Sequence, residues 1–355
     1  MRISIKKNIL ENIVNNTSSY LEKKDGSAVT AHILLEARAG VLNIKATDHE
    51  IGLFYKISDV NIVDEGTATA GGKRLLDILK GLKDGEVTLL VAGTTLHVKQ
   101  GRSNFKLPMF ETGDFPAFPT IAGKRKFEVD SIHFARNIKK LVNIIATNSP
   151  NYAMNGALID IKSDCIDLVA TDGKQLSVLN MPGTNAQADQ FILPKKAISE
   201  MQKIFYQKVE IWYDNSTMMA ICDEFEFFTK LINAKFPAYE RVIPKEFDQS
   251  LTIGRDSFLD GMKTISRVCE KMNIIITNGK ISFESVSDDN SEAKHEMDAE
   301  ISVKTDIQIC ITNKHLMDFL NNIENDKFVL NFNNPDSAIM LESGDLRTVV
   351  MPTIK

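Results

Sequence analysis

The chain has 355 residues, the usual length of two or three domains, and its 43% hydrophobic and 25% charged residues are typical of globular rather than disordered or fibrous proteins. Lys and Arg number 42 and Asp and Glu number 47, so the formal net charge is −5. This balance argues against a protein that is basic over its whole surface in order to hold nucleic acid.

The cysteines and the N-terminal segment indicate a reducing compartment. Cys165, Cys222, Cys269 and Cys310 are widely spaced and form no C-x-x-C pair, so we expect neither a zinc site nor a disulfide framework. The chain starts without an uninterrupted apolar run, and it has no stretch of about 18 apolar residues. We therefore expect a soluble, cytoplasmic protein without a signal peptide or a membrane span.

A strand followed by a helix recurs three times, with a period of about 124 residues. Each copy starts with alternating apolar residues and continues with apolar residues four positions apart, which is the spacing of one helix face. The pairs on this face are Leu10 and Val14, Phe134 and Ile138, and Phe258 and Met262. The repeat predicts three domains of one architecture.

A second helical pattern occurs later in each copy, at residues 73–82, 195–204 and 314–323, and a short strand-like run follows it. FPAF at 115–118 and FPAY at 236–239 close the first two copies, because proline ends strand pairing. We predict domains at 1–123, 124–247 and 248–355. Each should have two helices on antiparallel sheet, which is an α+β fold.

A turn-like segment lies between the two helices of the first two copies. ATDHEIGL at 46–53 matches ATDGKQLS at 170–177. The third copy has instead the polar segment SDDNSEAKHEMD at 287–298, which we interpret as a solvated acidic loop.

Positive charge is concentrated on the six predicted helices. Residues 6–15, 72–83, 131–142, 194–205, 255–267 and 313–323 carry formal charges of +1, +3, +3, +2, +1 and 0, which total +10 and leave −15 for the rest. In the third helix, Arg136, Lys139 and Lys140 lie opposite Phe134 and Ile138. Any surface helix has a charged outer face, but one sign on repeated helices favours a basic surface that contacts a phosphate backbone independently of sequence.

Several segments, in their order and spacing, resemble the bacterial DNA polymerase III β subunits, or sliding clamps. They include KRLLDILKGL at 73–82, QGRSNFKLP at 100–108, LVATDGKQLSV at 168–178, LPKKAISEM at 193–201, FTKLINAKFPAYERVIPK at 228–245 and the terminal VVMP. The resemblance covers essentially the whole chain. It implies three repeated DNA-clamp domains in a head-to-tail dimeric ring, with helices lining the hole and sheet outside. It also implies a processivity factor that holds double-stranded DNA topologically and has no catalytic residue, metal or cofactor.

The resemblance further implies a pocket for short hydrophobic peptides of the replicative polymerase, the clamp loader, repair polymerases and mismatch-repair proteins. Residues that match its walls are Met154, Thr171, Gly173, Lys174, Leu176, Pro237, Arg241, Val242, Val349, Val350, Met351 and Pro352. Lys174, Gln175 and the ending Thr353-Ile354-Lys355 depart from the common family pattern, which leaves the peptide preference open. Leu176, Val242 and Val349 would also suit an ordinary strand core.

The DNA contacts implied by the resemblance are Lys24, Lys73, Arg74, Lys80, Asn148, Asn151, Tyr152, Lys195 and Lys196, and the charge pattern adds Arg136, Lys139 and Lys140. Tyr152 can stack on an unpaired base, whereas the lysines act as point charges. Ala153 stands where relatives often have a second aromatic residue. Each lysine taken alone is also compatible with ordinary solvation.

The subunit contact implied by the resemblance joins Phe105 and Leu107 of the first domain to the helix at 255–267 and Val268 of the third. Arg267 occupies a position that is often apolar in the family. The sequence therefore predicts a dimer but not its strength.

Enzymatic alternatives find little support in the motifs. GTATAGGKR at 66–74 approaches the phosphate loop G-x-x-x-x-G-K-[ST], but Gly72 stands where Lys is required and Arg74 follows Lys73. ATDG at 170–173 offers one carboxylate in a turn, the six histidines have no ligand spacing, and no G-x-S-x-G occurs. A nucleotide-processing enzyme of repeated α+β domains and a protein scaffold that does not bind DNA remain the alternatives. Polymerase activity would belong to the complex that this subunit serves.

Overall fold

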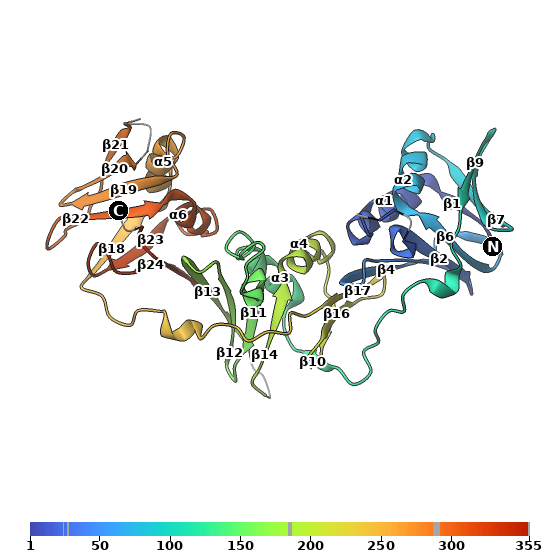
Figure 1. Cartoon of the computed structure of the whole chain (residues 1–355), viewed down its shortest axis with the longest axis horizontal. Helices are drawn as coiled ribbons and strands as arrows, with labels where there is room; N and C mark the ends of the chain where they lie inside the picture. Colours follow the sequence, from blue (N-terminus) through green and yellow to red (C-terminus); the bar gives the residue numbers. More distant parts are fainter. Residues whose placement is uncertain (24, 27, 184–186, 287–291, 354–355) are drawn as a thin grey trace. The chain divides into compact units, whose positions relative to one another are not determined.

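The structure is a computed structural model of the chain, and it describes all residues except 24, 27, 184–186, 287–291 and 354–355 (Figure 1). The chain divides into two units, which are considered separately. Unit 1 comprises Met1–Ile132 and Lys203–Leu231, and unit 2 comprises His133–Gln202 and Ile232–Lys355.

The described residues form six α-helices, as the repeat predicts. They are α1 (Lys7–Thr17), α2 (Gly72–Gly81), α3 (Ser131–Lys139), α4 (Lys195–Ile204), α5 (Arg255–Ile265) and α6 (Asn313–Leu320). The residues with i, i+4 spacing, such as Leu10 and Val14 on α1, are fully buried.

Unit 1 contains a five-stranded and an eight-stranded antiparallel sheet. The first has the order β5-β1-β7-β8-β9, formed by Asn61–Asp64, Arg2–Lys6, Glu86–Ala92, Thr95–Gln100 and Ser103–Pro108. The second has the order β10-β15-β16-β17-β4-β3-β2-β6, formed by Arg125–Phe127, Glu210–Tyr213, Thr217–Ile221, Phe225–Lys230, Ile51–Ile57, Val41–Thr47, His32–Arg38 and Gly66–Gly71.

Unit 2 contains an eight-stranded and a four-stranded antiparallel sheet. The first has the order β14-β11-β12-β13-β25-β24-β23-β18, formed by Asp189–Pro194, Gly156–Ile161, Cys165–Thr171, Gln175–Pro182, Leu346–Val350, Ile339–Ser343, Lys327–Phe332 and Gln249–Gly254. The second has the order β21-β20-β19-β22, formed by Lys294–Asp298, Lys280–Val286, Lys271–Thr277 and Ile307–Thr312.

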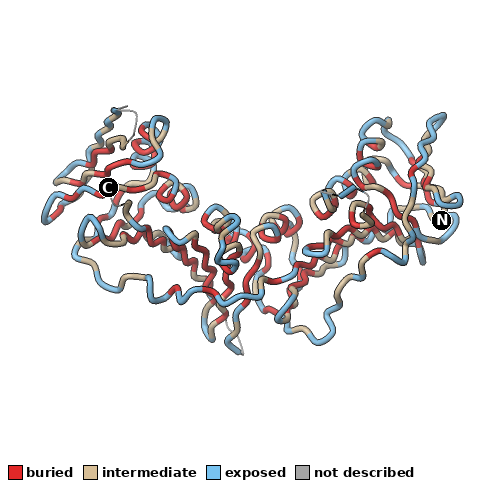
Figure 2. Tube along the Cα trace, viewed as in Figure 1, coloured by how far each residue is buried: buried red, intermediate tan, exposed pale blue. Residues whose placement is uncertain are grey.

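The core of each unit lies between its sheets and helices. Buried residues follow the sheet strands and the inner faces of the helices in both units (Figure 2). In unit 2, Phe328 packs against Phe258 of α5 and Phe319 of α6, with ring centroids 5.3 and 5.9 Å apart. The α+β class with helices on antiparallel sheet is therefore confirmed.

Each eight-stranded sheet joins strands of two successive sequence copies. In unit 1, β17 pairs with β4 and places Phe228 opposite Gly52. In unit 2, β13 pairs with β25 and places Leu176 opposite Val349. Because these sheets cross the predicted boundaries near 123 and 247, the contact-based units do not coincide with the three predicted domains. The exact domain limits stay a prediction.

Five of the six helices in the described structure are shorter than the sequence patterns predict, and α1 begins one residue later and ends two residues later than predicted. Lys6, Lys83, Lys140 and Arg267 lie just outside them, so the six observed helices carry a formal charge of +6 rather than +10. After α3 the chain continues in tight turns, in which Leu141 N donates to Ile138 O, while Leu141 itself remains buried. Buried apolar residues thus keep the helical spacing beyond Lys139, where α3 ends, and for this reason the sequence pattern predicts a helix that is too long.

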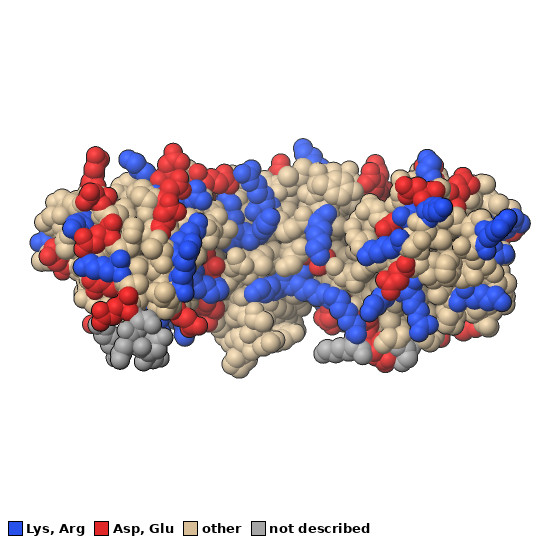
Figure 3. All heavy atoms as spheres, turned by 90° about the horizontal axis from the view of Figure 1, so that it is seen from above, with Lys and Arg blue, Asp and Glu red and all other residues tan. Residues whose placement is uncertain are grey.

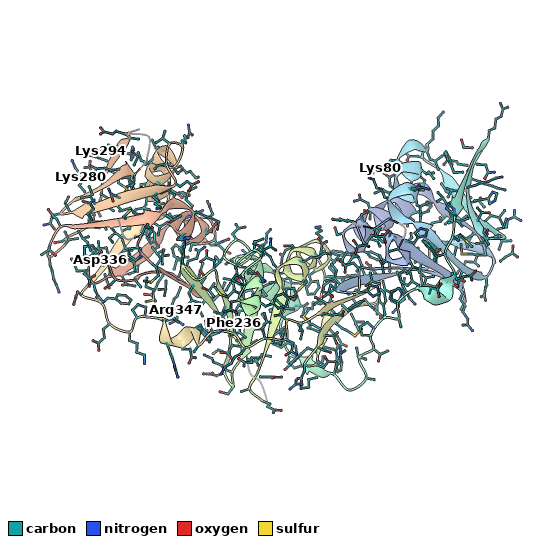
Figure 4. All side chains as sticks on the ribbon, viewed as in Figure 1. Lys80, Phe236, Lys280, Lys294, Asp336 and Arg347 are labelled. Carbon is teal, nitrogen blue, oxygen red and sulfur yellow. The ribbon has the colours of Figure 1, made fainter. Side chains whose placement is uncertain are left out.

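The interpretation of residues 287–298 as a loop is wrong over its second half. Lys294–Asp298 form β21, the edge strand of the four-stranded sheet, while residues 287–291 lie outside the described part. Two ion pairs join β21 to the neighbouring β20: Lys280 with Glu296 at 2.9 Å and Lys294 with Glu284 at 3.1 Å (both lysines are labelled in Figure 4). The segment looks like a loop in sequence because charged residues are common on edge strands, where they discourage unwanted pairing.

Among the described helices, none has the length and apolar character needed to cross a membrane.

Candidate functional site

Helix α2 presents predicted basic residues of unit 1 at both of its ends. Leu75 and Leu79 are fully buried beneath the helix, whereas Lys73, Arg74 and Lys80 are exposed on its outer side. Lys80 extends from the helix into solvent (Figure 4). These cations can reach a phosphate without being desolvated first. Lys24, also a predicted DNA contact, lies outside the described residues.

Two predicted cations of unit 2 are already paired with a carboxylate. Arg136 Nη2 and Lys140 Nζ lie 3.0 and 3.1 Å from Glu324 Oε1. The hydrogen bond from Lys140 and the charges of both cations lower the pKa of Glu324. Lys139, between them in sequence, is exposed. A DNA contact by Arg136 or Lys140 would therefore have to compete with Glu324.

Lys195 of α4 supports a loop rather than projecting freely. Its Nζ donates to Ile145 O at 2.9 Å and to Thr147 Oγ1 at 3.1 Å. Burial and the neighbouring Lys314 lower its pKa. The adjacent Lys196 is exposed. The sequence assigned both lysines to DNA, but the structure gives Lys195 an anchoring role that sequence alone does not reveal.

The loop anchored in this way carries three further predicted contacts. Asn148 and Asn151 are exposed, and Tyr152 is 65% exposed. The Asn155 side chain accepts from Ser149 N at 2.8 Å and donates to Ser149 O at 3.1 Å, which closes the loop. Tyr152 is therefore an exposed aromatic on a braced loop, a geometry suited to stacking on a base.

Charge is mixed on the face of the molecule shown in Figure 3. Lys and Arg side chains occur over this face of each unit, with Asp and Glu side chains among them. Basic character therefore belongs to particular elements, above all α2 and the ends of α3 and α4, and does not form a uniform coat.

The predicted peptide-binding residues of unit 2 gather around one turn and the C-terminal strand. Asp172 Oδ1 accepts from Lys174 N and Gln175 N, both at 2.9 Å, and Thr171 Oγ1 accepts from Gly173 N at 3.0 Å. Met351 N donates to Lys174 O at 2.9 Å. These bonds tie the residues after β25 to the turn between β12 and β13.

An apolar surface lies beside this turn, and we call it the Leu176–Val349 surface. Leu176 and Val349 are 5% and 3% exposed and belong to one buried cluster, so the core interpretation describes their own side chains correctly. Val242 and Met351 are 52% and 45% exposed. The other predicted residues with exposed or partly exposed surface are Met154, Gly173, Lys174, Pro237, Arg241 and Pro352. Exposed apolar side chains next to a hydrophobic cluster are suited to bind a short apolar peptide.

The predicted pocket residue Val350 and its cross-strand neighbour Gln175 do not contribute to the Leu176–Val349 surface. Val350 is fully buried and, as the neighbour of Val349 in a strand, faces the opposite side of the sheet. Gln175 is 1% exposed, and its Nε2 donates to Asp172 Oδ2 at 3.1 Å and Asp318 Oδ2 at 3.4 Å. The departure from the family pattern at Gln175 therefore alters the support of the turn, whereas the departure at Lys174 alters an exposed side chain.

A polar network that the sequence did not suggest holds the segment carrying Arg241 and Val242. Tyr239 Oη donates to Asp160 Oδ2 at 2.7 Å and lies 3.1 Å from Asp167 Oδ2. Lys162 Nζ lies 2.8 Å from Asp167 Oδ2 and 2.9 Å from Glu240 Oε1. Burial would raise the pKa of Asp167, but hydrogen bonds from Lys162 and Asn180 outweigh it and lower that pKa. The only sequence signal was Tyr in FPAY where FPAF has Phe.

The predicted subunit-contact residues lie at sheet and helix ends. Phe105 on β9, the edge strand of the five-stranded sheet, is 39% exposed, whereas Leu107 is 5% exposed. Val268, just after α5, is 48% exposed, and Arg267 is also exposed. Phe105 and Val268 are thus the apolar side chains that remain available to a partner.

Within the described part of the chain, no group of three or more His, Cys, Asp and Glu side chains could hold a metal ion.

Comparison with known proteins accounts for nearly every residue. Residues 1–119, 128–238 and 240–354 match the DNA polymerase III beta subunit N-terminal, central and C-terminal domains. The beta sliding clamp of Helicobacter pylori strain J99 is 32% identical over 351 residues, which cover 96% of this chain and 94% of that protein. The beta sliding clamp of Escherichia coli K12 is 22% identical over 364 residues, with 99% of both chains covered.

Solved structures agree with this assignment. The Helicobacter pylori beta clamp bound to a DNA ligase peptide has a TM-score of 0.94 and 31% identity, with both chains fully covered. The DNA polymerase III subunit beta of Pseudomonas aeruginosa, at 24% identity, shares the fold with a TM-score of 0.93. Since the sequence match extends through three successive domains, the chain belongs to the DNA polymerase III beta subunit family, the bacterial sliding clamps.

Proposed function

We propose that this chain is a DNA sliding clamp that encircles double-stranded DNA as a ring-shaped homodimer and tethers the replicative polymerase in the cytoplasm. The observation that carries the proposal is the match of residues 1–119, 128–238 and 240–354 to the three domains of the family. The family consists of non-catalytic processivity factors, and the comparisons give no support to the alternative of a nucleotide-processing enzyme.

Weak phosphate contacts suit such a function. A closed ring holds DNA by topology, so individual contacts need little affinity and sliding remains possible. Lys73, Arg74 and Lys80 on α2, together with Lys139, Lys196 and the loop of Asn148, Asn151 and Tyr152, are the exposed groups that we assign to DNA. The ion-paired Arg136 and Lys140 and the anchoring Lys195 would contribute less.

We assign partner docking to the Leu176–Val349 surface. The Helicobacter pylori relative was solved with a DNA ligase peptide, so that clamp binds a peptide. In this chain, Val242 and Met351 supply exposed apolar area, while Arg241 supplies a charged group that can orient a polar peptide residue. The partners would be the polymerase, the clamp loader and repair proteins.

We assign subunit contact to the edges formed by β9 and by α5 with Val268. β9 and β21 are both edge strands, with one side unpaired in the described structure, and such edges favour strand addition. Light scattering at micromolar concentration should give about 79 kDa, twice the 39.6 kDa of the chain. A monomer at that concentration would contradict the assignment.

Topology gives the decisive test of the function. A clamp loaded by its loader onto nicked circular DNA should remain bound during gel filtration and should be lost after the circle is linearised. Equal retention on both DNA forms would contradict a ring, and no retention on either would favour a scaffold that does not bind DNA. Blocking the ends of the linear DNA with bound protein should restore retention.

A further inference from the structure

A groove in unit 2 with a cavity volume of ≈ 530 Å³ takes no part in the functions assigned above. The segment at 239–247 lines one side of it, and Tyr239, Ile243 and Phe247 of this segment pack on the eight-stranded sheet. Residues of β12, β23, β24 and β25 complete the lining. None of the lining residues is among those assigned to DNA, to peptide docking or to subunit contact.

Part of the groove is apolar. Met340 and Tyr239 are 6% and 7% exposed, and Ile243 and Phe247 are half-buried. All four side chains belong to, or pack against, the hydrophobic cluster that contains Val349. An apolar ligand group that enters the groove can therefore be buried against a preformed surface.

Each carboxylate that lines the groove already has a donor. Lys162 Nζ lies 2.8 Å from Asp167 Oδ2 and 2.9 Å from Glu240 Oε1. Asn331 Nδ2 donates to Glu342 Oε2 at 2.7 Å. The negative charges of the groove are thus held by neighbouring groups of the chain.

Two cations of the groove lack such a partner. Arg347 lies opposite Glu342 in the pairing of β24 with β25, but no ion pair joins the two side chains. In the described part of the chain, the side chains of Arg347 and Lys245 make neither a hydrogen bond nor an ion pair. Lys245 is exposed, whereas Arg347 is half-buried, a position in which polar groups usually have a partner (Arg347 is labelled in Figure 4). The charge that remains available to a ligand is therefore positive.

The groove adjoins the Leu176–Val349 surface. Arg347 and Val349 are two positions apart on β25, so their side chains lie on the same sheet face, about 7 Å apart. Met340, which lines the groove, lies opposite Val349 in the pairing of β24 with β25. A peptide on that surface and a second segment in the groove would lie next to each other.

We propose that this groove binds an acidic peptide segment of a protein partner, with one carboxylate on Arg347, a second near Lys245 and an apolar side chain against Met340 and Phe247. The planar guanidinium of Arg347 can donate two parallel hydrogen bonds to a carboxylate. The inference goes beyond the proposed function, which places partner docking on the Leu176–Val349 surface alone. A partner with both a hydrophobic and an acidic segment would bind more tightly than through either segment.

NMR of the full chain with methyl-labelled methionine tests the proposal, because Met340 lines the groove and Met351 lies at the Leu176–Val349 surface. The acetylated peptide Glu-Glu-Phe-Glu-Glu should shift the Met340 signal, and added salt should weaken its binding. Met340→Leu and Met351→Leu assign the two signals. The peptide Gln-Gln-Phe-Gln-Gln, which has no carboxylate side chains, should bind more weakly.

Substitutions identify the groups that bind the acidic peptide. Arg347→Ala should weaken binding about fivefold through loss of a charge-assisted contact, and Lys245→Ala about twofold. Lys327→Ala is the matched control, because it removes an exposed lysine of β23 in the same sheet that does not line the groove, and it should leave binding unchanged.

Four results would overturn the proposal. They are the absence of a Met340 shift at millimolar peptide concentration, equal affinities of Arg347→Ala and Lys327→Ala, binding of Gln-Gln-Phe-Gln-Gln as tightly as the acidic peptide, and an equal Met340 shift with an oligothymidylate. The last result would assign the groove to nucleic acid.

The Met351 signal separates this inference from the proposed docking function. A short hydrophobic peptide should shift Met351 equally in wild type and in Arg347→Ala, which also shows that the variant is folded. Absence of a Met351 shift in wild type would contradict the docking assignment, while the response of Met340 to the acidic peptide would still report on the groove.

Discussion

The turns at 46–53 and 170–177 have the same hydrogen bonds but lie beside different sheet junctions. The first junction is the pairing of β4 with β17, and the second junction is the pairing of β13 with β25. Thr47 Oγ1 donates to Ile51 O at 2.7 Å, and Asp48 Oδ1 accepts from Glu50 N and Ile51 N, both at 3.0 Å. In the second turn, Thr171 Oγ1 donates to Gln175 O at 2.6 Å, and Asp172 Oδ1 accepts from the N–H groups of Lys174 and Gln175. The repeated letters Ala-Thr-Asp thus encode one turn used twice.

The sheet pairings beside these turns differ in how they are covered. Next to the first turn, Phe228 lies over Gly52, and Phe118 packs edge-on against Phe228 with centroids 4.9 Å apart. Next to the second turn, Leu176 and Val349 occupy the paired positions, and Val242 and Met351 remain exposed. The aromatic residues cover the first junction, whereas the second retains apolar area that can receive a peptide. This difference explains why one junction of a repeated protein would bind partners and the other would not.

The largest expected effect comes from replacing Gly52 at the first junction with leucine, the residue found at the corresponding position of the second junction, Leu176. A Cβ at Gly52 would overlap the Phe228 ring, so Gly52→Leu should force the ring out and destabilise unit 1 by about 3 kcal/mol. Trp212 on β15 is the single tryptophan and lies in unit 1, so its fluorescence during urea unfolding reports the change. Gly81→Leu is the control, because nothing lies within 4 Å of a Cβ there. Equal midpoints for both variants would show that Phe228 does not seal the junction.

The next effect concerns the network that fixes the segment beside the second junction. Asp167 is 5% exposed, and Asp167→Asn should destabilise unit 2 by about 2 kcal/mol at pH 7, because the charged bonds to Lys162 and Tyr239 are weakened. The pKa of Asp167 is lowered from 3.8 in the folded chain. Its stabilisation is therefore complete above the unfolded pKa and declines as the pH falls through the folded pKa.

Hydrogen exchange of the β12 and β13 amides measures this contribution directly. The difference between wild type and Asp167→Asn should be full at pH 7 and should shrink below about pH 4. Asp164→Asn, an exposed neighbour on the same hairpin, is the control. A difference that stays constant down to pH 3 would assign the effect to packing rather than to the carboxylate charge.

Much of the architecture follows from local patterns, whereas the fine structure of the sites depends on tertiary contacts. Six helices could be predicted because burial imposes i, i+4 spacing, as in Leu75 and Leu79. The strand β21 could not, since its Lys, His, Glu, Met and Asp give no apolar alternation. No pattern in the sequence around Lys195 predicts that its Nζ donates a hydrogen bond to Ile145 O, 50 positions away. Likewise, nothing in the sequence around Gln175 predicts that its side chain is buried and donates to Asp318.

Peptide binding should respond to a change at the second junction only. Met351→Ala removes an exposed apolar side chain next to Lys174 and should weaken a labelled short hydrophobic peptide about tenfold, or about 1.4 kcal/mol. Ile121→Ala is the control in unit 1, which also contains the first junction; it removes an apolar side chain that is 41% exposed and should leave affinity unchanged. Fluorescence anisotropy titrations compare the two. Indistinguishable binding by wild type and Met351→Ala would refute the assignment of the Leu176–Val349 surface.

The smallest effects should come from the turns themselves, and they separate structural equivalence from functional equivalence. Thr47→Val and Thr171→Val each remove a buried hydroxyl that donates to a carbonyl and accepts an N–H, so each should cost about 1 kcal/mol in the free energy of unfolding of its unit. Only Thr171→Val should also weaken peptide binding, by about twofold, because its turn holds Lys174 O against Met351 N. Equal losses of peptide affinity in both variants would mean that the two junctions are coupled, whereas a loss confined to Thr171→Val would show that one turn serves two purposes.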